Sequence, residues 1–308
     1  MKTNVKTPFE EIVEVGKIAT KEEGKNILDI VALAENEKLK PAASDVKKTL
    51  LLLIDPQNDF MEDIGSLAVP GSKGDIERLT KFIYQKMDTI TQIMCSTDTH
   101  SLAQIFHPCW WIDKDGNNPP PLTVITSADV ENGTWTPVFS PVNSIKYLKG
   151  LEEGNKKMLV IWPYHCLEQT NGAKIETQLT NMIYFHSNAR KTKPVFIRKG
   201  DRPLTEMYGI IKAEFDPGNG AFLNIAVLNA IEKFDEILIA GEAKSHCLLE
   251  SVKQILEYYA DQLEITKKIT VLEDGTSSIP GFETDTELFF ENAKKQYGIQ
   301  IKKMNELL

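Results

Sequence analysis

The chain has 308 residues, 26% of them charged, and its 44 acidic against 35 basic residues give a net charge of −9. A nucleic-acid-binding surface needs clustered lysine and arginine, and a membrane-spanning helix needs about 20 consecutive apolar residues; the sequence has neither. Residues 1–42 lack the apolar core of a secretory signal, and four cysteines are too few for a disulfide framework. We therefore expect a cytoplasmic globular protein whose partner is a small molecule.

The first 48 residues differ in pattern from the rest of the chain. They are rich in lysine and glutamate, and apolar side chains recur at helical spacing between Ile12 and Ile18 and again between Ile27 and Leu33. This predicts an N-terminal helical extension over residues 1–48, with two short helices that pack on or beside the main domain, residues 49–308.

From Thr49 onward, short apolar runs alternate with segments of helical periodicity. The apolar runs, which predict strands, are Thr49–Ile54, Thr91–Cys95, Met158–Trp162, Pro194–Ile197, Glu236–Ala240, Lys268–Leu272 and Gln300–Lys302. The helical segments are Ile76–Met87, Ala173–Phe185, Ala221–Phe234, Cys247–Tyr259 and Thr284–Tyr297. This alternation predicts a three-layer α-β-α fold with a mainly parallel sheet of about six strands, whose ligands bind beyond the carboxyl ends of the strands.

One stretch, at about residues 110–153, interrupts the alternation. It contains three consecutive prolines and an Asn-Asn pair and shows little periodicity. Structureless loops of this length are uncommon inside a compact domain and are usually functional. We therefore interpret Trp110–Glu153 as an insertion near the edge of the active site.

Polar side chains follow the first two predicted strands. Burial at the end of the first strand would raise the pKa of Asp55 and suit it to be a general base, although an Asp-Pro turn is the plainer interpretation. Asp98 and His100 follow the second strand. In an extended segment they share a face and form half of a site for zinc, iron or manganese; a helix cap at Asp98 is the alternative. His107 is open to the same two interpretations.

The third and fourth runs end in Trp162-Pro163-Tyr164-His165 and in Lys199. His165 adds a metal ligand if its strand lies beside the second strand, and Trp162 then offers an aromatic wall to a ring-shaped ligand. A buried tryptophan beside a proline turn is the alternative. Lys199 lies where a buried strand ends, and beside a thiol it would favour the thiolate.

The fifth run leads through small residues into a helix that begins near Cys247. Such a position exposes the thiol to the positive end of the helix dipole and to backbone N–H groups, which lower its pKa and can bind an oxyanion. Burial as a small apolar side chain is the default for a lone cysteine, and Cys95, Cys109 and Cys166 keep it. His246 is adjacent to Cys247, which argues against it as the partner base.

Taken in order, these motifs resemble those of one known family. From about Thr49 to the C-terminus the chain is similar to the isochorismatase-like cysteine hydrolases, and among them to the nicotinamidases. The matching segments are Asp55–Phe60 with Gly65–Val69, Asp98–His100, Trp162–Cys166, Lys199 and Gly241–Cys247.

The resemblance implies a role for each matching residue. It makes Asp55, Lys199 and Cys247 a catalytic triad. It makes Asp98, His100 and His165 the ligands of a divalent metal ion, zinc in the first place, with iron or manganese as alternatives. It further implies a cis peptide bond between Glu242 and Ala243, an oxyanion hole built from the backbone N–H groups of Ala243 and Cys247, and a substrate ring held by Phe60, Trp162 and Tyr208.

The reaction implied is the hydrolysis of nicotinamide to nicotinate and ammonia through a thioester on Cys247, a step of NAD salvage, in a chain that self-associates. The alternative is a related cysteine amidase acting on another small amide or carbamoyl compound, although such relatives generally lack the metal residues. True isochorismatases lack the cysteine, and a non-catalytic scaffold would not need all six residues. The extension, the insertion and Glu242, a potential charge near the oxyanion site, depart from the family pattern.

Overall fold

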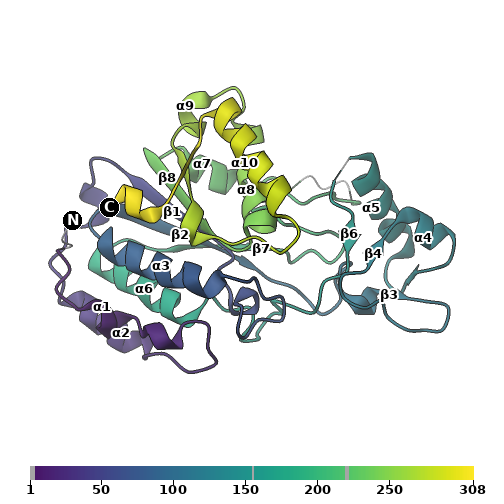
Figure 1. Ribbon diagram of the computed structural model, residues 1–308, viewed down its shortest axis with the longest axis horizontal. Coiled ribbons are helices and arrows are strands. Elements are labelled where there is room, and N and C mark those ends of the chain that lie inside the picture. Colours follow the sequence, from purple (N-terminus) through teal and green to yellow (C-terminus); the bar gives the residue numbers. More distant parts are fainter. Residues whose placement is uncertain (1–3, 155, 219–221) are drawn as a thin grey trace.

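A six-stranded parallel sheet forms the centre of the computed structural model, which describes residues 4–154, 156–218 and 222–308 (Figure 1). The strand order is β10-β9-β8-β1-β2-β7, and every pairing in this sheet is parallel. The strands are β1 (Thr49–Ile54), β2 (Ile90–Asp98), β7 (Val195–Lys199), β8 (Glu236–Gly241), β9 (Ile269–Leu272) and β10 (Gln300–Lys302). The predicted parallel sheet of about six strands is confirmed.

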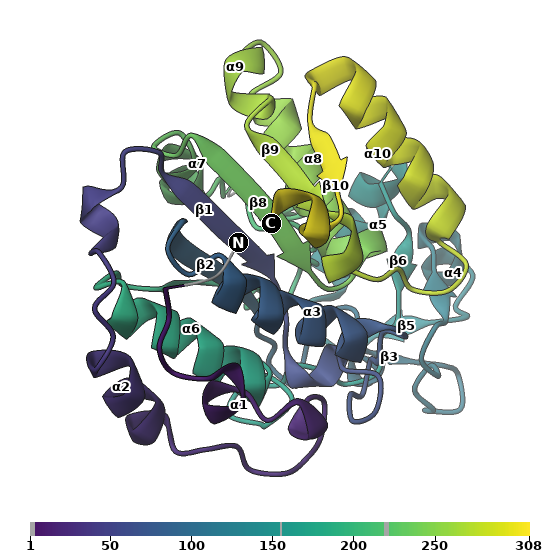
Figure 2. The same ribbon diagram turned by 60° about the vertical axis from the view of Figure 1, so that its left-hand side comes forward.

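Helices cover both faces of the sheet, as Figure 2 shows. One face carries α3 (Ser72–Gln85) and α6 (Thr177–Ala189); the other carries α7 (Ile225–Ile231), α8 (Leu249–Tyr258) and α10 (Glu283–Tyr297), with the short α9 (Leu263–Thr266) at its rim. The predicted three-layer fold is therefore confirmed. The helix predicted over Ala221–Phe234 is shorter than expected, and Ala221 lies outside the described residues.

Each face of the sheet has its own apolar core, because side chains alternate between the two faces along β1. Leu51 and Leu53 point into the core shared with α3 and α6, whereas Leu50 and Leu52 point into the core shared with α7 and α8. All four side chains are fully buried, because a central parallel strand has no solvent-facing side.

The N-terminal segment packs against α6 on the same side of the sheet as α3 (Figure 2). It contains α1 (Phe9–Ile12), a 3₁₀ turn (Val15–Lys17) and α2 (Ile27–Glu35), so the first predicted helix is interrupted. The break lies at Val13, whose backbone is extended. The side chain of Asn26 caps α2 by accepting the N–H of Leu28 at 2.9 Å.

The segment predicted to be structureless is folded, which corrects the sequence interpretation. It forms β3 (Trp111–Ile112), β4 (Val124–Ile125), α4 (Ser127–Glu131), β5 (Thr136–Pro137) and α5 (Pro141–Glu153), and projects from one end of the sheet (Figure 1). Thr126 and Asp129 form a capping box at the start of α4. Trp110, Trp111 and Tyr147 are buried and give this segment its own apolar contacts. Strands of two residues leave no periodic pattern to detect.

The apolar run Met158–Trp162 is not a strand of the central sheet, as had been expected. Only Leu159 and Val160 are in a strand, β6, and they pair antiparallel with Ile125 and Val124 of β4. The inserted segment thus supplies the partner that the sequence pattern assigned to the main sheet. In the described ranges, no helix has the length and apolar character needed to cross a membrane.

Candidate active site

Three of the predicted catalytic residues converge at the carboxyl edge of the sheet. Asp55 follows β1, Lys199 ends β7, and Cys247 lies in the turn after β8. Strands β8 and β1 are neighbours, and β2 separates β1 from β7. The ammonium of Lys199 lies 2.9 Å from Asp55 Oδ2 and 3.7 Å from Cys247 Sγ. All three side chains are buried. The sequence prediction placed them together, and the structure does so.

Asp55 is held by the adjacent strand. The hydroxyl of Ser96 on β2 donates to Asp55 Oδ1 at 2.7 Å and accepts the backbone N–H of Asp55 at 3.1 Å. Burial raises the pKa of Asp55, which Lys199 lowers and Asp98 raises again. The raised pKa is the direction the sequence predicted for a general base.

Cys247 lies in a π-helical segment, Lys244–Leu248, that leads into α8 and that we name the nucleophile turn. Burial raises the pKa of this thiol well above its usual value, although Lys199 lowers it. The predicted lowering by the helix dipole is therefore wrong in its net direction, because desolvation outweighs it. The raised pKa favours the protonated thiol.

The other three cysteines do not line the cavity that Cys247 lines. Cys95 and Cys166 are buried, as predicted, but Cys109 is partly exposed, which corrects the expectation of burial. Burial and then the charge of Lys157 lower the pKa of His246 to about 3, so its imidazole is neutral.

The peptide bond between Glu242 and Ala243 is cis, as the resemblance implied. The Glu242 side chain is fully buried and faces Asp75 and Ser277, away from the cavity that Cys247 lines. Burial and then Asp75 raise the pKa of Glu242 well above its usual value, which favours the neutral carboxyl over the charge that the sequence indicated.

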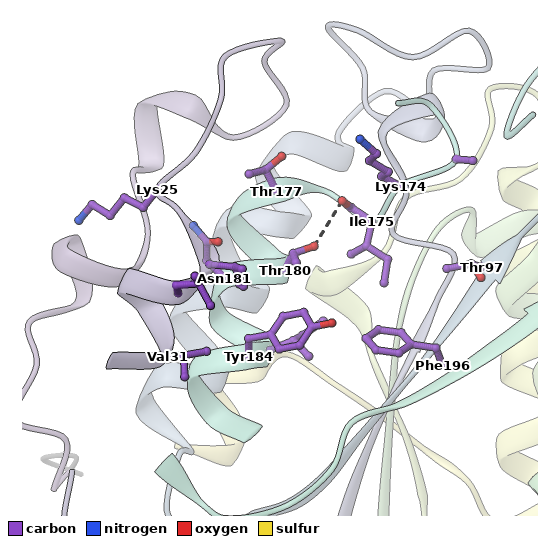
Figure 3. Close-up of a pocket in the computed structure, with 14 residues that line it drawn as sticks. Lys25, Val31, Thr97, Lys174, Ile175, Thr177, Thr180, Asn181, Tyr184 and Phe196 are labelled. Carbon is purple, nitrogen blue, oxygen red and sulfur yellow. Dashed lines mark hydrogen bonds between the residues drawn. The ribbon is translucent and has the colours of Figure 1, made fainter. Parts of the chain in front are cut away.

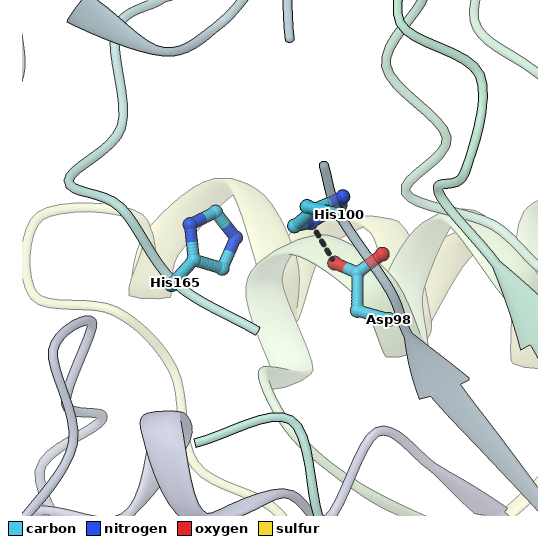
Figure 4. A group of neighbouring side chains, drawn as sticks. All are labelled: Asp98, His100 and His165. Atoms are coloured by element: carbon cyan, nitrogen blue, oxygen red, sulfur yellow. Dashed lines mark ion pairs between the residues drawn. The ribbon is translucent and has the colours of Figure 1, made fainter. Parts of the chain in front are cut away.

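The predicted metal ligands also come together (Figure 4). Asp98 ends β2, His100 lies just beyond it, and His165 approaches from a separate loop, so that one ligand atom of each lies within 4.8 Å of the others. His100 Nε2 is 3.1 Å from Asp98 Oδ2. Burial would raise the pKa of Asp98, but His100 and then Lys199 lower it well below its usual value.

Backbone carbonyls orient both histidine rings. His100 Nδ1 lies 2.9 Å from the carbonyl of Gly200, and His165 Nδ1 lies 2.8 Å from that of Pro163. His165 therefore uses its Nδ1–H for the backbone and keeps the Nε2 lone pair for a metal ion, whereas His100 Nε2 faces Asp98 Oδ2. Burial, then His100, lowers the pKa of His165 to about 3, so its ring is neutral. This donor set, one carboxylate and two imidazoles, suits zinc or iron.

His107 lies beside this group without joining it. Its ring centre is 5.8 Å from that of His100 and 5.9 Å from that of His165. Its Nδ1 lies 3.0 Å from the carbonyl of Leu102, while its buried Nε2 has no hydrogen-bond partner among the described residues. Burial lowers the pKa of His107 to about 4.

Two contacts connect the cluster of Asp55, Lys199 and Cys247 to the three candidate metal ligands. Neither contact was predicted from the sequence. Lys199 Nζ lies 3.1 Å from Asp98 Oδ1, so one ammonium pairs with both carboxylates. Gln57 clamps the backbone of Asp98: its Oε1 accepts the N–H of Asp98 at 2.6 Å, and its Nε2 donates to the carbonyl at 2.7 Å. No sequence pattern indicates this clamp, because Asp55 has a positive φ of 43° and segment 55–57 is therefore not extended.

A small cavity lies at the junction of the two groups of residues, with about 30 Å³ of space for a water-sized molecule. The predicted substrate-binding residues Phe60, Trp162 and Tyr208 all line it, as do Cys247, His165 and Asp98. This volume holds about one water molecule, far less than the roughly 300–1,000 Å³ of ligand pockets, so a ring-shaped ligand requires the cavity walls to move apart.

Residues that the sequence did not single out as ligand-binding complete the cavity wall: Leu67, Val69, Glu206, His246 and Ile279. Trp162 Nε1 donates to Glu206 Oε1 at 2.7 Å. Burial raises the pKa of Glu206 to about 8, so this carboxyl is largely protonated at neutral pH. No motif pointed to Glu206, because its role depends on the loop after β7 folding back over Trp162.

A larger groove lies elsewhere, between α2, α6 and the edge strand β7. In Figure 3, Tyr184 of α6 and Phe196 of β7 face one another across it, with Val31 of α2 on the far side. None of the predicted catalytic or metal-binding residues lines this groove.

No protein-family model and no curated protein sequence matches this chain. Solved structures do match. A nicotinamidase/pyrazinamidase from Acinetobacter baumanii is 18% identical, with a TM-score of 0.54 over 86% of this chain and 100% of that one. The yeast nicotinamidase bound to the inhibitor nicotinaldehyde is 18% identical, with a TM-score of 0.55 over 83% and 99%. A protein from L. infantum in complex with nicotinate is 15% identical, with a TM-score of 0.51 over 87% and 97%.

These likenesses establish the architecture. The chain has the three-layer α/β fold of the nicotinamidases, and it spans essentially the whole length of each of these structures.

Proposed function

We propose that this chain is a metal-dependent cysteine amidohydrolase that converts nicotinamide, or a closely related aromatic amide, to the carboxylic acid and ammonia. The main support is the convergence of Cys247, Asp55 and Lys199 on one small cavity beside Asp98, His100 and His165. The shared fold with nicotinamidases adds to this support.

The first step in this proposal is activation of the thiol. Asp55 accepts the proton of Cys247, and the thiolate attacks the amide carbon to form a C–S bond. Lys199 lies within 3.7 Å of the sulfur and 2.9 Å of the carboxylate, so its charge stabilises the thiolate as it forms. The raised pKa of Cys247 explains why a base is needed at all.

The second step releases ammonia. The backbone N–H groups of Ala243 and Cys247 bind the oxyanion, and the protonated Asp55 gives its proton to the leaving nitrogen as the C–N bond breaks. A water molecule then cleaves the thioester, which yields the acid and restores the thiol of Cys247.

A metal ion fits the residues present. Asp98, His100 and His165 would hold it, with zinc as the first choice, and it would supply a Lewis-acid contact that binds and orients the ligand. Phe60, Trp162 and Tyr208 would enclose the flat ring of that ligand in the cavity.

A second candidate is a related cysteine amidase that acts on another small amide or carbamoyl compound. The observation that favours it is the polar wall of the cavity, where the neutral carboxyl of Glu206 and the neutral imidazole of His246 offer hydrogen bonds that a plain pyridine ring does not need.

The proposed function is tested by an ammonia-release screen with zinc-loaded protein over nicotinamide, pyrazinamide and linear amides. We expect release from at least one aromatic amide and none from the Cys247→Ala variant, while Cys109→Ala serves as the matched control with full activity. Ammonia release retained by Cys247→Ala would instead indicate hydrolysis by the metal group alone.

A further inference from the structure

The inserted segment Trp110–Glu153, together with the residues after it, contacts the proposed active site at three places. Strand β4 pairs with β6, which leads directly into Trp162. The hydroxyl of Tyr147 on α5 accepts the backbone N–H of Glu206 at 3.0 Å. Lys157, which follows α5, reaches the nucleophile turn. The segment therefore packs against residues that form the cavity wall.

Lys157 contacts both the nucleophile turn and Tyr208. Its ammonium donates to the backbone carbonyl of Ser245 at 2.9 Å and lies 5.3 Å from the centre of the Tyr208 ring. A cation in this position is attracted to the face of the ring. Burial lowers the pKa of the half-buried Lys157, while the charges of Glu250 and Cys247 raise it. The ammonium is thus directed inward, toward the nucleophile turn.

The carbonyl that Lys157 binds belongs to a peptide constrained on both sides. The N–H of the same peptide, that of His246, donates to the carbonyl of Ala243 at 3.0 Å. The side chain of Ser245 is also fixed, since its Oγ accepts the N–H of Ile279 at 3.0 Å and lies 2.9 Å from His246 Nδ1. Because Ser245 lies between Ala243 and Cys247, the orientation of its peptide determines where the backbone of both residues points.

We propose that Lys157 is a positioning residue for the reaction: by holding the Ser245 carbonyl and the Tyr208 ring, it fixes the nucleophile turn against the substrate cavity. Lys157 does not line the cavity and acts only through the groups it holds. The kinetic consequence rests on the proposed function. The chemical consequence does not, because the reactivity of Cys247 toward an alkylating reagent is independent of the substrate.

The experiment compares three variants in a Cys109→Ser background, which removes the partly exposed thiol. Lys157→Met keeps the length of the side chain and removes its charge, and Lys157→Arg restores a cationic donor. Lys156→Met is the matched control, because the adjacent lysine pairs with Glu214 at 3.6 Å instead of with the nucleophile turn. The readouts are kcat and KM for ammonia release, the rate of Cys247 alkylation by iodoacetamide from peptide mass spectrometry, and urea unfolding.

In Lys157→Met we expect kcat to fall about 10- to 100-fold, the range for a misplaced reacting group, with KM changed by less than about 3-fold. The alkylation rate should fall by about 3-fold or more, because the turn no longer holds the sulfur beside Lys199. Lys157→Arg should recover most of both losses, and Lys156→Met should show neither.

Wild-type kcat and alkylation rate in a folded Lys157→Met variant would overturn the proposal. If Lys157→Met fails to fold, Lys157→Gln, which keeps a polar head group, is subject to the same two readouts and the same criterion. If the wild-type protein releases ammonia from no amide, the proposed function fails, while the alkylation contrast between Lys157→Met and Lys156→Met still decides the role of Lys157.

Discussion

The ammonium of Lys199 is the only cation in direct contact with both Asp55 and Asp98 among the described residues, so its removal is the most informative single change. At 2.9 Å and 3.1 Å, an effective dielectric constant of about 20 gives a gross attraction of about 5–6 kcal/mol for each pair. Desolvation of the buried ammonium offsets most of this. Lys199→Met leaves two carboxylates buried without their partner, and loss of one member of such a cluster costs about 3–5 kcal/mol.

The assay is urea denaturation followed by tryptophan fluorescence at about pH 7, with EDTA present so that bound metal does not contribute. Lys212→Met is the matched control, since it breaks an ion pair of the same length, 2.9 Å to Glu257, on the surface. That change should cost about 0.5 kcal/mol or less. If the free energy of unfolding of Lys199→Met lies within about 1 kcal/mol of the wild-type value, the ammonium does not hold the two carboxylates together, and the electrostatic account of the triad is wrong.

Two other changes test separate parts of the structure. Burial raises the pKa of Glu176 from 4.5 to about 7, so the folded state binds this proton more tightly than the unfolded state does. The free energy of unfolding therefore falls as the pH rises from about 4.5 to about 7, by about 3 kcal/mol in all. Glu176→Gln should remove that slope in denaturation curves at about pH 5 and about pH 8; an unchanged slope would contradict the assignment. His165→Ala should weaken zinc binding more than about 100-fold, as measured by metal analysis. His186→Ala, which changes a buried histidine outside this group, should leave zinc binding unchanged. Full zinc occupancy in His165→Ala would show that His165 is not a ligand.

The central sheet could be predicted because buried parallel strands carry their signal locally. The segment Thr49–Ile54 is apolar from its second residue onward, and the structure begins and ends β1 at the bounds of this segment. The rule that ligands bind at the carboxyl edge directed attention to the strand ends, and the family resemblance then grouped Asp55, Lys199 and Cys247. The resemblance supplied the roles, and the topology supplies the distances.

The inserted segment could not be predicted, because its short strands depend on partners that are distant in sequence. Val160 is part of an apolar run that could belong either to the central sheet or to another strand. In the structure it pairs with Val124 of β4, which lies 36 residues earlier in the sequence. Tyr147 and Trp111 are buried by the same contacts, which local periodicity does not encode.

The electrostatics of the site were the least predictable part. The sequence indicated a helix start at Cys247, from which a lowered pKa follows, but the degree of burial that reverses this direction exists only in three dimensions. The pairing of Lys199 with Asp98 and the neutral carboxyl of Glu206 likewise depend on loops closing over the strand ends. Residue type alone indicates which groups can react, and packing determines their protonation.

The claim that Cys247 carries the acyl group is tested most directly by acid-quenched mass spectrometry of zinc-loaded protein during turnover of the best amide from the screen. The account predicts a mass increase equal to the acyl group, located on the peptide that contains Cys247 and absent from Cys247→Ala. Steady ammonia release with no adduct on Cys247, and an equal rate in Cys247→Ala, would contradict it.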